Sequence, residues 1–177
     1  ALYRIFCLAS FLPPFLISAF RAYSIGTDTS GTYYNMYYNV LNGFGGMRDV
    51  GYGFINKLAI MLFDDYSGVL ILTSLIFCGI SFKCIFSESK YPVLSVILFF
   101  ATNVYFISMN MIRQSIAISL FMMSIPHIKN KSLFKFLILN IIATSIHTTS
   151  IIYIALYFLL QRKLKIKTII IVCILTS

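Results

Sequence analysis

Ionisable and amide side chains are scarce in this chain, and six of them have types and spacing that could support chemistry: Arg21, Asp28, Asn110, Arg113, Gln114 and His147. An arginine fork binds oxyanions through two parallel hydrogen bonds. The amides of Asn110 and Gln114 would add donors for an anionic or sugar ligand. His147 is the side chain best suited to accept a proton near neutral pH, and Asp28 is a second candidate base.

Each of these residues also has a structural alternative. Arg113 would be a snorkelling arginine at the end of a helical hairpin, His147 a hydrogen-bonded interfacial histidine, and Asp28 a turn residue in "GTDT". Tyr33 and Tyr34 belong to a tyrosine-rich stretch that would form either an aromatic belt at the membrane surface or a stacking platform for sugars. Asp49 in "MRDVGYGF" is a further candidate. It would either bind substrate or only neutralise the neighbouring Arg48.

Composition indicates a membrane protein. Of the 177 residues, 59% are apolar and 11% are charged, compared with about 25% charged in soluble domains. The net charge of +9 lies in short clusters between apolar runs, which indicates membrane topology and argues against a nucleic-acid-binding surface. Cysteine, histidine and acidic residues lack metal-ligand spacing, so we expect neither a metal nor another cofactor.

The uncharged runs predict an all-α, polytopic integral membrane bundle in a single domain, residues 1–177, because none of them alternates as barrel strands do. The expected spans cover about 2–20, 66–86, 91–109 and 111–128, and a further span starts at 168. That last run stops at residue 177, so we expect the chain to be truncated at its C-terminus.

A fifth run, residues 133–160, is long enough for one span, yet lysine clusters lie at both of its ends. One interpretation is a broken, re-entrant helix whose two halves meet at "TSIHTTS", residues 144–150. The alternative is a single tilted span, which would place the basic stretch "QRKLKIK" outside.

The long segment 21–65 is expected to be an extracytoplasmic loop. Within it, "FINKLAIMLFDDY", residues 54–66, has apolar Phe54, Leu58, Met61 and Leu62 at helical spacing, which predicts an amphipathic interfacial helix. If the lysine-rich loops are cytoplasmic, the candidate side chains all lie towards the outer face.

Four stretches in this order carry a family resemblance: "FRAYSIGTDT" followed by tyrosines, "RDVGYGFINKL", "NMIRQSIAISL" and "HTTSIIYI". The chain resembles the EpsG family of Wzy-type O-antigen and exopolysaccharide polymerases from about Arg21 to Tyr157. It departs from that family's pattern in having Asp49 where Glu is more usual, with no proline following.

The resemblance implies a glycosyl transfer at the outer face of the bacterial cytoplasmic membrane. The substrates would be oligosaccharide repeat units of an O-antigen, capsule or exopolysaccharide, carried on undecaprenyl pyrophosphate. Arg21 and Arg113 would bind the pyrophosphate, His147 would be the general base, and Asp28 would order Arg21 or assist as base. A chain-length regulator and a flippase of the same pathway are implied partners.

Three other functions remain open from the sequence. An O-antigen ligase would use the same carrier, and a transporter or flippase would also use broken helices and intramembrane charges. The cytoplasmic halves of the runs are nearly all apolar, apart from Ser81 and Asn140, which argues against a polar conduit. A purely structural membrane subunit would make the polar clustering accidental.

Overall fold

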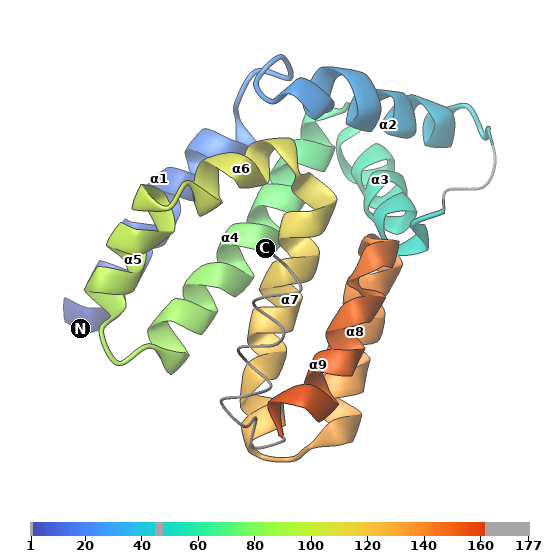
Figure 1. The fold of residues 1–177 in the computed structure, drawn as a ribbon. Coiled ribbons are helices and arrows are strands. Elements are labelled where there is room, and N and C mark those ends of the chain that lie inside the picture. Colours follow the sequence, from blue (N-terminus) through green and yellow to red (C-terminus); the bar gives the residue numbers. More distant parts are fainter. Residues whose placement is uncertain (1, 45–47, 162–177) are drawn as a thin grey trace, which may run out of the picture.

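The computed structural model describes residues 2–44 and 48–161, and all regular elements in this part of the chain are helical (Figure 1). Its elements are α1 (Leu2–Ala19), the π-helical turn η1 (Thr29–Tyr33), α2 (Tyr34–Leu41), α3 (Val50–Phe63), α4 (Ser67–Glu88), α5 (Pro92–Ala101), α6 (Val104–Asn110), α7 (Ile112–Lys129), α8 (Leu133–Ile146), the 3-10 turn η2 (Thr148–Ile151) and α9 (Ile152–Leu160). The all-α prediction is confirmed, and α1, α4 and α7 begin and end close to the expected bounds.

The lengths of the helices are consistent with a membrane protein. Among the described residues, α4 is the one helix that is long and apolar enough to cross a bilayer by itself, with 22 residues. The α5–α6 pair passes the same criterion only when the two helices are taken together. Shorter apolar segments lie in α1, α3, α8 and the η2–α9 stretch.

The expected span 91–109 is not one continuous helix. Asn103 has a φ of 62° and separates α5 from α6, which are bent by 50° relative to each other. A second break follows at Met111, whose φ and ψ of −101° and 55° are not helical. The prediction of a single helix is wrong here because hydropathy records the apolar character of a run and not the backbone conformation within it.

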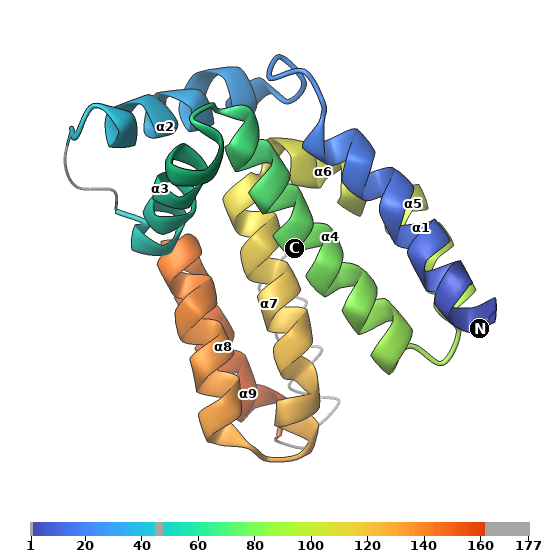
Figure 2. The ribbon, with the colours of Figure 1, turned by 180° about the vertical axis from the view of Figure 1, so that it is seen from behind.

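The segment predicted as the loop 21–65 is largely folded. η1 and α2 cross one end of the bundle, while α3 packs between α4 and α8 (Figures 1 and 2). A helix is confirmed in the predicted stretch as α3, which starts at Val50 and ends at Phe63, with Ile55 and Ala59 buried and Phe54 and Met61 exposed.

Hydrogen bonds between polar side chains also join helices inside the bundle. The hydroxyls of Ser18 and Ser74 lie 2.8 Å apart and link α1 to α4. The amide of Asn140 donates to the Ser124 hydroxyl at 3.1 Å and links α8 to α7. Small and hydroxyl side chains of this kind allow close helix approach in an apolar environment and stabilise it through hydrogen bonds.

The helices α8 and α9 form a hairpin. Phe136 near the start of α8 packs against Tyr157 near the end of α9, with ring centroids 4.9 Å apart. The chain turns at His147, whose extended backbone ends α8. The predicted break within residues 144–150 is therefore confirmed, and a single continuous helix over 133–160 is not present (Figure 1).

Candidate active site

The carboxylate of Asp49 joins three elements that are far apart in the chain. Its Oδ2 forms an ion pair with Arg113 Nη1 in the first turn of α7. Its Oδ1 accepts hydrogen bonds from the backbone N–H of Thr148 at 3.0 Å and from the Thr148 hydroxyl at 2.5 Å. Asp49 itself directly precedes α3 and is 6% exposed. This one side chain therefore holds the starts of α3, α7 and η2 together.

Asp49 is ionised in this environment. Burial alone raises the pKa of a carboxyl group, but the two hydrogen bonds from Thr148 and the charge of Arg113 outweigh it and hold the pKa of Asp49 below its ordinary value. The expectation that Asp49 neutralises its sequence neighbour Arg48 is wrong, because its ion-pair partner is Arg113 and Arg48 is exposed.

Two tyrosine rings enclose the Arg113 guanidinium. Its carbon lies 5.6 Å from the centroid of Tyr33 and 5.9 Å from that of Tyr52, within the range of a cation–π interaction. The Nε of Arg113 and the hydroxyl of Tyr52 are both buried and have no hydrogen-bond partner among the described residues. Burial raises the pKa of Tyr52 well above its ordinary value, so its hydroxyl remains a protonated donor.

His147 lies in the break between α8 and η2, immediately before Thr148. Its ring is half-buried, and its Nδ1 has no hydrogen-bond partner within the described part of the chain. A neutral imidazole has one nitrogen that accepts a proton. The backbone thus places a candidate base next to the Asp49–Arg113 ion pair, and we refer to Asp49, Arg113, Thr148 and His147 as the Asp49 centre.

Gly51 allows this arrangement, because a side chain there would overlap the Ser145 hydroxyl and lie 3.0 Å from the Ile146 side chain. We expect Gly51→Ala to push α3 away from α8 and to destabilise the protein by roughly 1–3 kcal/mol, measured by thermal unfolding in detergent. Gly79→Ala in α4 is the matched control, because a Cβ added at Gly79 would meet no heavy atom within 4 Å. Equal unfolding temperatures for both variants and the unsubstituted protein would contradict the packing of α3 on α8.

Arg21 has a different environment. Its Nη1 donates to the carbonyl and the hydroxyl of Ser18 at 2.7 and 3.0 Å, and its Nη2 donates to the Met109 carbonyl at 3.1 Å. These carbonyls lie at the C-terminal ends of α1 and α6, where helix dipoles favour a positive charge. Arg21 is 8% exposed and ties the two helix ends together.

The "GTDT" turn is docked on the end of α6. The backbone N–H of Asp28 donates to Asn110 Oδ1 at 2.9 Å, and the Thr29 hydroxyl donates to the Met109 carbonyl at 3.1 Å. Gly26 makes this approach possible, since it has a φ of 95° and a Cβ there would lie 2.8 Å from the Met109 oxygen. The prediction that Asp28 orders Arg21 is wrong, because Ser18 and Met109 supply the hydrogen bonds of Arg21.

Comparison with protein families adds an independent observation. The family model described as the EpsG family matches residues 4–176. The chain belongs to the EpsG family. Membership suggests a role in exopolysaccharide biosynthesis. No curated protein and no solved structure matches this chain.

In this EpsG family chain, the expected single polar site is resolved into two groups. One is the Asp49 centre with Tyr33, and the other joins Arg21 to the Asp28–Asn110 contact. Asn110 does not share a helical face with Arg113 and Gln114, because the break at Met111 ends α6 and starts α7. Gln114 is half-buried in α7 and forms no side-chain hydrogen bond to the other candidates.

Two residues of the Asp49 centre and its surroundings were not among the sequence candidates. Tyr52 lies inside the "RDVGYG" stretch that also supplied Asp49, and Thr148 directly follows His147. Thr148 is one of five hydroxyl residues in the polar stretch "TSIHTTS", and nothing in its type distinguishes it from the other four. The only indication in the sequence was that each of the two residues lies close to a candidate. The residues that Tyr52 and Thr148 contact, Arg113 and Asp49, are too distant in the sequence for these contacts to be inferred.

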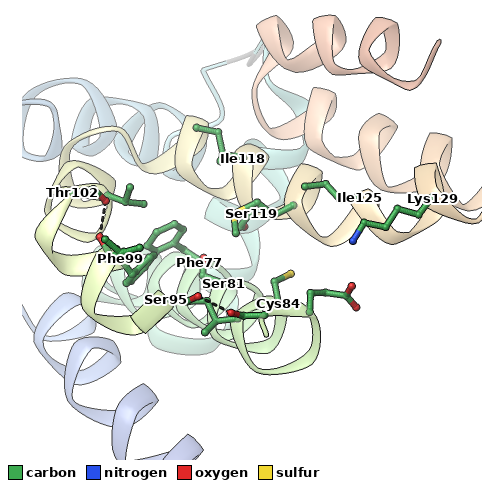
Figure 3. Close-up of a pocket in the computed structure, with 16 residues that line it drawn as sticks. Phe77, Ser81, Cys84, Ser95, Phe99, Thr102, Ile118, Ser119, Ile125 and Lys129 are labelled. Atoms are coloured by element: carbon green, nitrogen blue, oxygen red, sulfur yellow. Dashed lines mark hydrogen bonds between the residues drawn. The ribbon is translucent and has the colours of Figure 1, made fainter. Parts of the chain in front are cut away.

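A cleft of about 400 Å³ between α4, α5 and α7 is separate from this centre (Figure 3). Its walls are mostly apolar, with Phe77 and Phe99 on one side and Ile118 and Ile125 on the other, and it extends to Lys129. None of the sequence candidates lines it. The described residues also include no group of three His, Cys, Asp or Glu side chains that could hold a metal ion.

Proposed function

We propose that this chain is a membrane polysaccharide polymerase of the outer face of the bacterial cytoplasmic membrane. It would join oligosaccharide repeat units carried on undecaprenyl pyrophosphate into an O-antigen, capsule or exopolysaccharide. The observation that carries the proposal is the Asp49 centre, in which three distant elements bring an arginine, a carboxylate and a histidine together. A flippase and a chain-length regulator of the same pathway are its proposed partners.

The distribution of lysines supports the outer location. Lys90 lies in the connection between α4 and α5, and Lys129 and Lys131 lie at the connection between α7 and α8. Both connections are at the lower end of the bundle in Figure 1, whereas the starts of α7 and η2 lie at the other end. Because short cytoplasmic loops are enriched in lysine and arginine, the Asp49 centre would face outwards.

The proposed reaction forms a bond between a hydroxyl oxygen of the incoming unit and the anomeric carbon of the growing glycan. The bond from that carbon to the pyrophosphate oxygen breaks, and the lipid pyrophosphate leaves with the electron pair. His147 would take the proton of the attacking hydroxyl. The chemistry therefore requires one base and a fixed positive charge near the leaving group.

Arg113 is suited to stabilise the leaving pyrophosphate. A guanidinium has five N–H donors, and Asp49 and the two tyrosine rings fix its plane without using all of them. A guanidinium held in this way needs little reorganisation when charge develops on the leaving group.

Deletion of the gene in its host, followed by glycan electrophoresis, tests the proposal. A polymerase defect is expected to remove the ladder of long chains and to leave single repeat units. Complete polymer retained on the lipid carrier would instead indicate a ligase, and absence of any unit at the outer face would indicate a flippase. An unchanged ladder would contradict all three functions and favour a structural subunit.

A further inference from the structure

We propose that a second cavity, of about 550 Å³, is a carbohydrate subsite that holds one sugar residue of the glycan. It lies where the chain leaves α1, between the start of α2 and the start of α4. Its volume is in the range of roughly 300–1,000 Å³ that is typical of small-molecule sites. The inference rests on the proposed function for the identity of its ligand.

Three tyrosines supply the aromatic wall of this cavity: Tyr23, Tyr34 and Tyr66. The ring centroids of Tyr23 and Tyr34 lie 6.5 Å apart, and those of Tyr34 and Tyr66 lie 5.3 Å apart in an edge-to-face arrangement. Tyr66 is fixed because it is 5% exposed and its hydroxyl donates to the Thr29 carbonyl at 3.1 Å. Flat aromatic surfaces with polar edges suit a sugar, whose C–H faces are apolar and whose rim carries hydroxyls.

Asp65 supplies a charged acceptor in the same cavity. Its Oδ2 accepts the Ser67 backbone N–H at 3.0 Å. Hydrogen bonds from Ser67 hold the pKa of Asp65 below its ordinary value, so the group is an ionised carboxylate. An ionised carboxylate has about four lone-pair positions, and those that remain can accept hydrogen bonds from sugar hydroxyls.

Arg21 also lines this cavity and places a positive charge at its wall. More than nine-tenths of this residue is buried, and its Nη1 and Nη2 are held by the carbonyls of Ser18 and Met109. The cavity thus combines an aromatic wall, a carboxylate acceptor and a fixed positive charge, unlike the mostly apolar cleft of Figure 3.

The cavity adjoins the Asp49 centre through the tyrosines of η1 and α2. Tyr33 packs on the Arg113 guanidinium, whereas the next residue, Tyr34, lines the cavity. The ring of Tyr33 contacts Tyr52, and the ring of Tyr37 contacts Tyr66 at 5.6 Å. A glycan whose reacting end lies at the Asp49 centre would place a neighbouring sugar in this cavity.

Binding of the repeat-unit oligosaccharide to the purified full-length protein tests the subsite. The probe is the single unit released from the host's own polysaccharide, and its affinity is measured by titration calorimetry in lipid nanodiscs. We expect Tyr34→Ala and Asp65→Asn each to weaken binding by about tenfold or more. In Asp65→Asn, the side-chain carbonyl can still accept the Ser67 N–H, so the start of α4 is preserved.

Two controls match these variants. Tyr91→Ala removes an exposed tyrosine at the other end of the bundle, and Asp64→Asn changes the acid next to Asp65, which does not line the cavity. Asp64 has a φ of 51°, which asparagine also tolerates. Both control variants should bind the oligosaccharide with the same affinity as the unsubstituted protein. Absence of binding to the unsubstituted protein, or unchanged affinity in both cavity variants, would overturn the subsite.

The same measurements separate this inference from the proposed function. His147→Ala should bind the oligosaccharide normally while forming no polymer. If His147→Ala loses polymer and Tyr34→Ala binds normally, the polymerase proposal stands and the subsite is wrong. If Tyr34→Ala loses binding and His147→Ala makes normal polymer, the subsite stands and the proposed catalytic role of His147 is wrong.

Discussion

Replacing Asp49 with alanine is expected to remove long polysaccharide chains and to leave single repeat units on the lipid carrier. The substitution takes away the ion-pair partner of Arg113 and the acceptor of both Thr148 hydrogen bonds. The starts of α3, α7 and η2 then lose the contact that holds Arg113 near His147. Glycan electrophoresis and analysis of lipid-linked units in a complemented deletion strain measure the result.

The same substitution is also expected to destabilise the protein by roughly 1–3 kcal/mol. It leaves the Arg113 guanidinium without its counter-ion and the Thr148 N–H without an acceptor. A partly buried polar group without a partner lowers the free energy of unfolding by about this amount. Loss of polymer from Asp49→Ala alone would therefore not distinguish a catalytic centre from a structural ion pair. Thermal unfolding in detergent gives the stability of each variant separately from its activity.

The double variant Asp49→Ala/Arg113→Ala makes that distinction. Removing both charges eliminates the unpaired guanidinium, so the unfolding temperature should return part of the way towards that of the unsubstituted protein. Polymer should remain absent, because the positive charge proposed to stabilise the pyrophosphate is gone as well. Recovery of polymer together with stability would show that the pair has only a structural role.

Asp49→Glu is the conservative counterpart of these variants. A glutamate keeps the charge and both acceptor oxygens. It should therefore retain Arg113 pairing and much of the polymer. Asp64→Asn serves as the control for loss of an acidic side chain elsewhere, since Asp64 is exposed at the end of α3. Wild-type chain length from Asp49→Ala at normal protein level would contradict the assignment.

The sequence predicted those features that depend on local pattern. The hairpin of α8 and α9 followed from an apolar run with lysines at both ends and a polar string in its middle. The helix α3 followed from apolar residues at helical spacing. Family membership followed from motifs whose order and separation are specific even though each motif alone is weak.

The features that the sequence did not predict depend on backbone conformation or on distant contacts. Asn103 interrupts a run whose composition gives no reason for a break, whereas the break at Met111 lies where two expected spans meet. The partners of Asp49 lie 64 and 99 residues away, whereas Arg48 is adjacent in the sequence and would be the obvious counter-ion. Once α3 packs against α8 through Gly51, the carboxylate is directed towards Arg113 and Thr148 instead.

The separation of Arg21 from the Asp49 centre has the same origin. Arg21 and Arg113 have the same chemistry, and both were expected to bind one pyrophosphate. The structure gives Arg113 a carboxylate partner and gives Arg21 the carbonyls of two helix ends. Which helix ends meet is a property of the packed bundle. Residue types alone therefore identify candidates without assigning each one to a site.

Replacing His147 with glutamine is expected to lower the rate of polymer formation by about 10²- to 10⁴-fold, the usual contribution of a general base. Glutamine has a similar size and keeps a polar group in the break between α8 and η2, but it cannot accept the proton of the attacking hydroxyl. The Nδ1 of His147 has no hydrogen-bond partner in the described residues, so stability should change little. The rate is measured with purified protein and lipid-linked repeat units.

A pH series tests the base more directly than a single rate. A histidine base acts in its neutral form, so the rate of the unsubstituted protein should fall as the pH is lowered and the imidazole becomes protonated. The small residual rate of His147→Gln should not show this fall at low pH, which we call the acid limb of the pH–rate profile. His127→Gln is the matched control, because His127 lies in the last turn of α7 at the opposite end of that helix from Arg113. If His127→Gln removes the acid limb, or His147→Gln keeps it at a normal rate, His147 is not the base, because the titrating group then lies elsewhere.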